Sequence, residues 1–334
     1  VLATAYDKAG RIISETDANK HTTRYRYGKT GLVSEITDAL GQKALFEYDA
    51  LGNVTKITAP GNAVTQYAYD ISGRLTTQTD ATGLVTEYGY DENSQLISVV
   101  TNGNESLYEY DAMGNVSSVT DAEGRCIKLT YDLNGNLTEI IYPDGTKDVT
   151  EYDALGRVVQ STPRTGLATA YAYDESGNIV RMTQGEQTTA YEYDLLGRMV
   201  RQIAADGTET VYAYDALGNL VGQTDELGNQ TTFSYTAESL LEQVTYANGA
   251  SQSLSYDLAG NITGETDAEG NAKQYQYDKA NRLIAVVDEL GGKTSYAYDA
   301  MDHIVQVTDA LRHATKYTYD KDGNLTSETD ALGN

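Results

Sequence analysis

Apolar and polar residues alternate along this chain in short blocks of six or seven residues, which are rich in Thr, Val, Ile and Tyr. In the block that ends Thr65, Gln66, Tyr67, Ala68 and Tyr69, every second residue is aromatic or threonine and the residues between are small or polar. A period of two is typical of a β-strand with one covered face. Each block therefore predicts a strand about 20 Å long with an aromatic face and a mixed, more solvated face.

Turn signals separate these blocks every ten or eleven residues, in the form Asp-x-x-Gly. Asp49 to Gly52 is an example of the first turn in a repeat, and Asp38 to Gly41 is an example of the second. The Asp carboxylate accepts backbone N–H bonds at the start of such a turn, and Gly takes a positive φ at its end. We expect hairpin turns with a bulge. In four first turns the glycine is replaced by Ser94, Ser239, Asn281 and Asp302. Asn and Asp tolerate the left-handed conformation, but the sequence gives no comparable reason for the two serines.

Both signals belong to one repeat, whose anchor is a tyrosine that recurs every twenty or twenty-one residues. The sixteen anchors are Tyr6, Tyr27, Tyr48, Tyr69, Tyr90, Tyr110, Tyr131, Tyr152, Tyr173, Tyr193, Tyr214, Tyr235, Tyr256, Tyr277, Tyr298 and Tyr319. An aliphatic residue follows each anchor by six positions, and we expect the two to pack together across neighbouring strands. Such regular self-similarity predicts one repeat array over residues 1–334, and we expect it to be a segment of a longer chain.

Strands joined by tight turns pair antiparallel, so the fold class is all-β, a long hairpin meander of about thirty-two strands. Because twist accumulates in so long a sheet, we expect it to curl into part of a hollow spiral shell. The chain has 28 Tyr but only two Phe and no Trp, which favours a sheet one layer deep over a thick aliphatic core.

Charge narrows the range of partners. Lys and Arg total 24 against 49 Asp and Glu, and a net charge of −25 excludes nucleic acid as a partner. No run of eighteen apolar residues predicts a membrane span, and the first residues show no export signal. Cys126 is the only cysteine and is interpreted as a small strand residue.

No group of residues predicts catalysis. His21, His303 and His313 are the only histidines, and they are interpreted as solvated turn residues. The many Asp residues occupy turn positions, which explains them without acid–base chemistry. The turns supply oxygen atoms but lack the alternating Asp and Asn spacing of calcium loops. We therefore predict no catalytic, cofactor or metal site and no enzymatic activity.

The repeat Tyr-Asp-x-x-Gly-(Asn/Arg)-aliphatic, followed by Thr-Asp-x-x-Gly and Thr-x-Tyr-x-Tyr-Asp, resembles the Rhs or YD repeat over all 334 residues. That family includes bacterial Rhs polymorphic toxins, Tc toxin C subunits and teneurins. For the toxins, the resemblance implies a secreted shell that sequesters a toxic C-terminal cargo domain of the same parent chain, beside further shell and delivery domains, in bacterial competition. The motif residues then have structural roles; examples are Tyr48, Asp49, Gly52, Tyr69, Asp70, Gly73, Tyr152, Asp153, Gly156, Tyr214, Asp215 and Gly218.

The chain departs from a complete Rhs protein in several respects. It contains no Asp-Pro pair, so the self-cleavage motif that the resemblance implies does not lie in this segment. Gly28 and Thr236 stand where the Asp after the anchor is expected. An extracellular adhesion or glycan-binding surface remains the alternative function, because exposed tyrosines stack on sugars and teneurins use such repeats at cell surfaces.

Overall fold

The computed structural model describes residues 3–334, and within them it is almost entirely antiparallel β-structure. Among residues 3–334, thirty-two strands form one sheet, and the only helical segment is the 3-10 turn η1 (Pro60–Asn62). This confirms the predicted fold class and the expected number of strands.

The bounds of the strands divide the chain almost evenly. In chain order they are β1 (Ala3–Tyr6), β2 (Ile12–Thr16), β3 (Thr22–Tyr27), β4 (Val33–Thr37), β5 (Lys43–Tyr48), β6 (Val54–Thr58), β7 (Val64–Tyr69), β8 (Leu75–Thr79), β9 (Val85–Tyr90), β10 (Leu96–Thr101), β11 (Asn104–Tyr110), β12 (Val116–Thr120), β13 (Cys126–Tyr131), β14 (Leu137–Ile141), β15 (Lys147–Tyr152) and β16 (Val158–Thr162). They continue with β17 (Thr169–Tyr173), β18 (Ile179–Gln184), β19 (Gln187–Tyr193), β20 (Met199–Ile203), β21 (Glu209–Tyr214), β22 (Leu220–Thr224), β23 (Gln230–Tyr235), β24 (Leu241–Thr245), β25 (Ser251–Tyr256), β26 (Ile262–Thr266), β27 (Ala272–Tyr277), β28 (Leu283–Val287), β29 (Lys293–Tyr298), β30 (Ile304–Thr308), β31 (Ala314–Tyr319) and β32 (Leu325–Thr329).

Pairing follows the chain, and a bulge lies at the anchor tyrosine of the hairpins described here. In the β5–β6 hairpin the register runs to Glu47 opposite Lys56, then shifts so that the anchor Tyr48 lies opposite Val54. The anchor and the aliphatic residue six positions later are thus cross-strand partners, as the spacing predicts. The shift recurs at the anchor of the other hairpins whose register is resolved in the same way, for example between Ala68 and Tyr69.

The two faces of the sheet differ in exposure. Along β5, Ala44, Phe46 and Tyr48 are partly covered, while the residues between them are exposed. The same alternation appears along β7, so the aromatic face is the covered one, as predicted. Coverage is nevertheless incomplete, because no large side chain among the described residues is fully buried.

A sheet one layer deep leaves much surface in contact with water. The chain exposes 20762 Å², whereas a compact protein of its mass of 36.3 kDa exposes about 13,000 Å². Ala63, Ala285 and Ser118 are among the few buried residues. Stability therefore comes from contacts between adjacent strands and turns.

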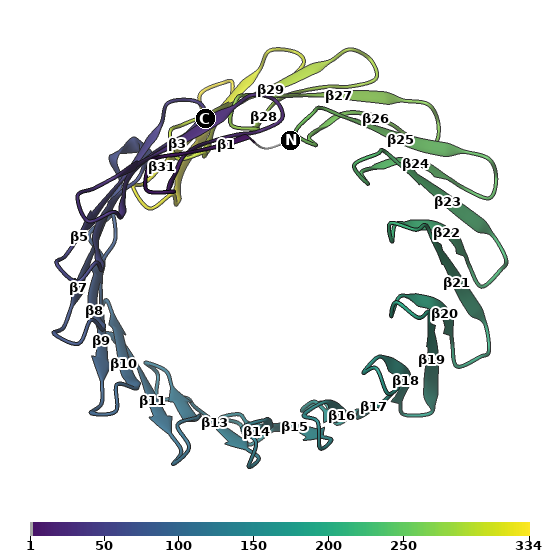
Figure 1. The fold of residues 1–334 in the computed structure, drawn as a ribbon, viewed down its shortest axis with the longest axis horizontal. Helices are drawn as coiled ribbons and strands as arrows, with labels where there is room; N and C mark the ends of the chain where they lie inside the picture. Colours follow the sequence, from purple (N-terminus) through teal and green to yellow (C-terminus); the bar gives the residue numbers. More distant parts are fainter. Residues whose placement is uncertain (1–2) are drawn as a thin grey trace. The chain divides into compact units, whose positions relative to one another are not determined.

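The chain divides into two compact units, one made of residues up to Glu87 together with Ser251–Asn334, and the other of Tyr88–Ala250. In the first unit, repeats from the two ends of the chain lie side by side, as Figure 1 shows for the purple β1 and β3 and the yellow β29 and β31. Within residues 3–334, no helix has the length and hydropathy needed to cross a bilayer.

Candidate functional site

The first turn of each repeat is organised around its aspartate. In the turn Asp49 to Gly52, the Asp49 carboxylate Oδ1 accepts hydrogen bonds from the backbone N–H groups of Leu51 and Asn53, both at 2.9 Å. Gly52 N–H donates to the Asp49 carbonyl at 3.2 Å, and Gly52 has a φ of 92°. The same arrangement surrounds Asp70, Asp153 and Asp215. These predicted motif residues therefore close the hairpin through their side chains as well as their backbone.

The Asn or Arg five positions after the anchor completes the turn. Asn53 Nδ2 donates to Asp49 Oδ2 at 2.9 Å, and Arg157 Nε donates to Asp153 Oδ2 at 2.7 Å. Both residue types place an N–H group within hydrogen-bonding distance of the carboxylate, which explains why this position alternates between them. The hydrogen bonds lower the pKa of Asp49, chiefly through the Asn53 side chain, and that of Asp153, chiefly through the Arg157 backbone N–H.

Arginine at this position also reaches the next repeat. The Arg157 guanidinium carbon lies 4.5 Å from the centre of the Tyr173 ring, and its Nη1 donates to the Asp174 carbonyl at 3.4 Å. Arg198 makes the equivalent contacts with Tyr214 and Asp215. One side chain thus joins its own turn aspartate to the anchor tyrosine and the turn of the following repeat.

Anchor tyrosines link repeats in the opposite direction. The Tyr48 hydroxyl donates to the Val33 carbonyl of the preceding repeat at 2.8 Å, and Tyr69 does the same to Val54 at 2.9 Å. Tyr152 and Tyr214 bond in this way to Leu137 and Met199. We call the anchor tyrosine, the first-turn aspartate and the residue five positions after the anchor, taken over all repeats, the first-turn ladder.

The ladder explains the residues that replace the first-turn glycine. Ser239, Asn281 and Asp302 all have a positive φ, from 60° to 66°. Each accepts a hydrogen bond from the ladder residue of the preceding repeat, Asn219 at 3.2 Å, Asn261 at 3.0 Å and Arg282 at 2.6 Å respectively. A polar side chain is favourable at the fourth turn position because a hydrogen-bond donor of the preceding repeat lies beside it. This contact explains Ser239, for which the sequence alone gave no reason.

In two repeats another residue replaces the first-turn aspartate, but the backbone still forms the turn. Thr236 replaces the aspartate, and its hydroxyl accepts from the backbone N–H groups of Glu238 and Leu240 at 3.2 and 3.3 Å. At Gly28 the backbone bonds alone close the turn, with the Gly31 N–H donating to the Gly28 carbonyl at 3.0 Å.

The three histidines follow turns and face turn aspartates. His303 Nδ1 lies 3.1 Å from Asp299 Oδ2, and its ring stacks on Tyr319 with the centres 4.6 Å apart. His313 Nδ1 lies 3.0 Å from Asp309 Oδ2. His303 therefore occupies the ladder position of Asn or Arg, and its surroundings are structural.

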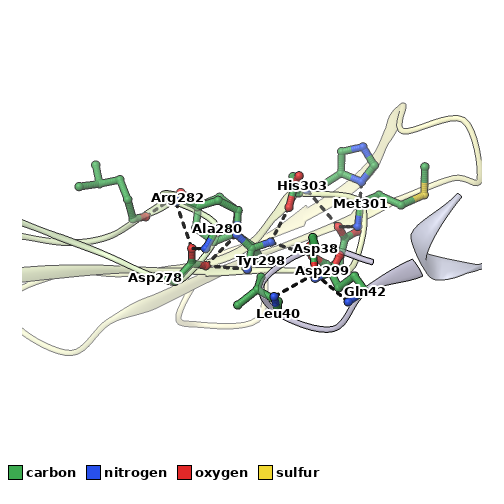
Figure 2. A network of polar contacts seen from close by, with 12 residues as sticks. Asp38, Leu40, Gln42, Asp278, Ala280, Arg282, Tyr298, Asp299, Met301 and His303 are labelled. Atoms are coloured by element: carbon green, nitrogen blue, oxygen red, sulfur yellow. Dashed lines mark hydrogen bonds and ion pairs between the residues drawn. The ribbon is translucent and has the colours of Figure 1, made fainter. Parts of the chain in front are cut away.

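In the first unit, second turns from the N-terminal repeats meet first turns from the C-terminal repeats. Asn19 donates to Asp257 at 2.9 Å, and Asn281 donates to Asp17 at 3.2 Å. Figure 2 shows Asp38, Leu40 and Gln42 lying against the turns that begin at Asp278 and Asp299. The second turn of one repeat thus meets the first turn of a repeat that comes about twelve repeats later in the array.

The contact continues in the next two repeats. A Cβ on Gly61 would lie 3.2 Å from Met301 Cγ, and the Ala81 and Thr82 N–H groups donate to the Asp322 carboxylate at 2.9 and 3.1 Å. Two rows of turns are therefore complementary to each other, through both apolar and polar contacts.

A shallow depression lined by Asn19, Lys20, His21, Arg24 and Lys279, among others, opens where the two rows meet. Across residues 3–334, no three His, Cys, Asp or Glu side chains are grouped so as to hold a metal ion.

The sequence predicts the turn positions of the aspartates and glycines, but not the side-chain bonds that link one repeat to the next. The available signal was the recurrence of Asn, Arg or His five residues after the anchor, all of which carry an N–H donor. Nothing in the local sequence indicated which turns meet in the first unit.

Comparisons with known proteins agree with this architecture. The sequence model of the family described as RHS Repeat matches residues 6–44, 48–85, 72–106, 90–125, 110–147, 152–189, 214–251, 240–272, 256–293, 277–314 and 302–334. No curated protein matches the chain. Two crystal structures are similar over 98% of this chain: TcdB2-TccC3-TEV, with 16% identity and a TM-score of 0.80, and TcdB2-TccC3 without hypervariable C-terminal region, with 17% identity and a TM-score of 0.82. The chain covers 21% of each of those chains, about a fifth of their length.

Proposed function

The chain belongs to the RHS repeat family, and on that premise we propose that it forms part of the wall of a toxin shell. In this proposal the shell encloses a toxic C-terminal domain of the same parent chain until delivery outside the producing bacterium. The remaining shell and the delivery domains complete the assembly.

The observation that carries the proposal is the fold similarity over almost the entire chain to two TcdB2-TccC3 structures, with TM-scores of 0.80 and 0.82. One of these is described as lacking a hypervariable C-terminal region. A variable region at the end of a constant repeat scaffold is the arrangement expected if one shell serves different cargo domains. The identity of 17% restricts this support to the fold.

The physical character of the sheet also suits a wall. A single layer encloses the most volume for a given number of residues, and the first-turn ladder joins neighbouring repeats by side-chain bonds as well as strand pairing, as at Tyr48 and Arg157. The net charge of −25 keeps such an extended surface soluble and repels nucleic acid.

We further propose that the segment has no catalytic role of its own. The histidines and most of the aspartates with lowered pKa values are engaged in closing turns, for example His303 with Asp299. These groups are dispersed along the array, whereas catalysis requires unlike groups that converge.

Electron microscopy of the full parent protein tests the proposal. The expected result is density for a domain enclosed by repeat walls, and protection of that domain from added protease. A solid rod or flat sheet without enclosed density would refute the shell function.

A further inference from the structure

The depression between the two rows of turns differs in charge from the chain as a whole. It has a volume of about 380 Å³, within the range of roughly 300–1,000 Å³ that is typical of small-ligand sites. Lys20, His21, Arg24 and Lys279 line it together with three uncharged residues. Among the described residues no Asp or Glu lines it, although the chain has 49 acidic residues against 24 Lys and Arg. Positive charge gathered in a depression of so acidic a protein indicates a surface suited to an anion.

The walls of the depression come from both rows. Counting repeats by their anchor tyrosines, residues 19–21 belong to the second turn of repeat 1 and Ala39 to that of repeat 2, while Lys279 belongs to the first turn of repeat 14. Hydrogen bonds of 2.9 and 3.2 Å hold the second turn of repeat 1 between the first turns of repeats 13 and 14. The contact between the two rows therefore forms this depression.

The cations in the depression keep their charge free for a ligand. Within residues 3–334, no ion pair joins Lys20, Arg24 or Lys279 to a carboxylate, and all three are exposed. Arginines of the first-turn ladder differ in this respect, since Arg282 holds Asp278 at 2.7 Å. A cation without an internal partner can form charge-assisted hydrogen bonds to an anion from solvent.

The aspartates that begin the surrounding turns use their carboxylates within those turns. Asp17 Oδ1 accepts from the His21 N–H at 2.8 Å, and Asp17 Oδ2 lies 3.3 Å from His21 Nδ1. Asp38 Oδ1 accepts from two backbone N–H groups of its own turn, and Asp278 is bound by Arg282. These carboxylates reduce the positive potential near the depression, but none of the three lines it.

Lys20 occupies a backbone position that glycine fills in most other second turns. It is the fourth residue of its turn, with a φ of 68°, and its N–H donates to the Asp17 carbonyl at 3.0 Å. Gly41, Gly83 and Gly270 have the same position and also a positive φ. Lysine carries a Cβ that glycine lacks, so it is strained in this left-handed conformation. Residues kept in strained conformations cluster at ligand sites, which points to a binding role for the Lys20 side chain.

We propose that this depression binds a phosphate or sulfate group carried by a small molecule. Arg24 binds the oxygen atoms of the group through its paired N–H donors, and Lys20 and Lys279 bind them as point charges on flexible stems. Nucleic acid does not fit, because the net charge of −25 repels a long phosphate backbone beyond this short cluster. Binding at this site is additional to the proposed shell function, which makes no use of the depression.

Isothermal titration calorimetry with inorganic phosphate and, separately, inorganic sulfate tests the site in the 334-residue chain. At least one of the two anions should bind saturably with a dissociation constant in the millimolar range or below, and added sodium chloride should weaken that binding. The anion with the smaller dissociation constant identifies which of the two groups the natural ligand carries.

Two substitutions remove a cation and install a residue that other repeats carry at the same position. Lys20→Gly introduces the glycine found at Gly41, and Lys279→Ala introduces the alanine found at Ala50, so both variants should fold. Lys20→Gly should melt no lower than the unaltered chain, because glycine adopts the positive φ without strain. Each substitution should nevertheless raise the dissociation constant of the bound anion by about tenfold.

Arg312→Gly and Lys8→Ala are the matched controls. Arg312 is the fourth residue of its second turn with a φ of 69°, as Lys20 is in its own, and Lys8 has the turn position of Lys279. Neither residue lines the depression. Both controls change the net charge as much as the test variants do, and both should leave anion binding unchanged.

Two results would overturn the proposal. The first is the absence of saturable binding by either anion at millimolar concentration. The second is equal weakening by Lys20→Gly and Arg312→Gly, which would mean that anions respond to the net charge of the chain and not to this depression.

Discussion

At the residue scale, the repeat uses its aspartate to satisfy backbone donors that a strand cannot satisfy at its end. Asp153 accepts from Leu155 N–H, Arg157 N–H and Arg157 Nε at 2.9, 3.0 and 2.7 Å. Glycine is needed at the fourth position for its positive φ, as at Gly156 with 77°. The sequence predicts both choices because turn chemistry is local. It does not predict the bond from one turn to the next, which depends on how repeats stack.

Substitutions at Gly156 should separate these two requirements. A Cβ there would lie 3.5 Å from Asn136 Oδ1, in ordinary contact, and Asn281 shows that Asn adopts this conformation beside Asn261. Gly156→Asn should lower the free energy of unfolding by less than about 1 kcal/mol, whereas Gly156→Val should lower it by about 2 kcal/mol because a β-branched residue resists a positive φ. Urea unfolding followed by circular dichroism measures both. Equal losses for the two variants would contradict this account.

Acid should unfold the chain through these same aspartates. Their hydrogen bonds lower the pKa of many first-turn carboxyls, including Asp49, Asp70 and Asp215. A carboxyl with a lowered pKa stabilises the fold above its unfolded pKa, near 3.8, and that contribution is lost as pH falls through the folded pKa. The melting temperature should change little from pH 7 to about pH 5 and then fall steeply. Melting curves at successive pH values test this, and a constant melting temperature down to pH 2 would refute it.

At the element scale, each hairpin is joined to its neighbours through one face. The Tyr173 hydroxyl donates to the Val158 carbonyl at 2.7 Å, and Tyr173 is the cross-strand partner of Ile179. The period of two predicts which residues share the aromatic face, because side-chain direction alternates strictly along a strand. It does not identify the carbonyl that the hydroxyl reaches, which lies fifteen residues earlier in an adjacent hairpin.

Tyr173→Phe and Tyr173→Ala should separate the contribution of the hydroxyl group to this link from that of the aromatic ring. The phenylalanine removes one hydrogen bond and should lower the free energy of unfolding by about 1 kcal/mol. The alanine also removes the ring, with its contact to Arg157, and should cost about 2 kcal/mol or more. Thermal melting of both variants measures the order of the effects.

The control for this series lies one residue away. Ala172 is exposed on the opposite face, so Ala172→Thr should change the melting temperature far less than Tyr173→Ala. Greater sensitivity at Ala172 would show that the faces are assigned the wrong way round.

At the scale of the whole molecule, the sequence predicts a continuous array but not which distant repeats meet. Contact between neighbouring repeats follows from the tight turns, so the hairpin order could be inferred residue by residue. The contacts Asn19–Asp257 and Ala81–Asp322 join residues more than two hundred positions apart. They depend on the accumulated twist of many strands, and small changes in twist per strand shift the meeting point by whole repeats.

A substitution at Leu40 tests how much that distant contact contributes to the stability of the first unit. Leu40→Asp places a carboxylate beside the turns that begin at Asp278 and Asp299, where the two rows meet. Burial and like charge both oppose it, so the variant should lower the free energy of unfolding of this unit by about 1 to 2 kcal/mol and speed hydrogen exchange in those two turns. Leu227→Asp, at an equivalent position that is 87% exposed, should do neither. Because both substitutions change the same turn position in the same way, any difference between them reports the row contact itself, and equal effects would mean that the contact does not contribute to stability.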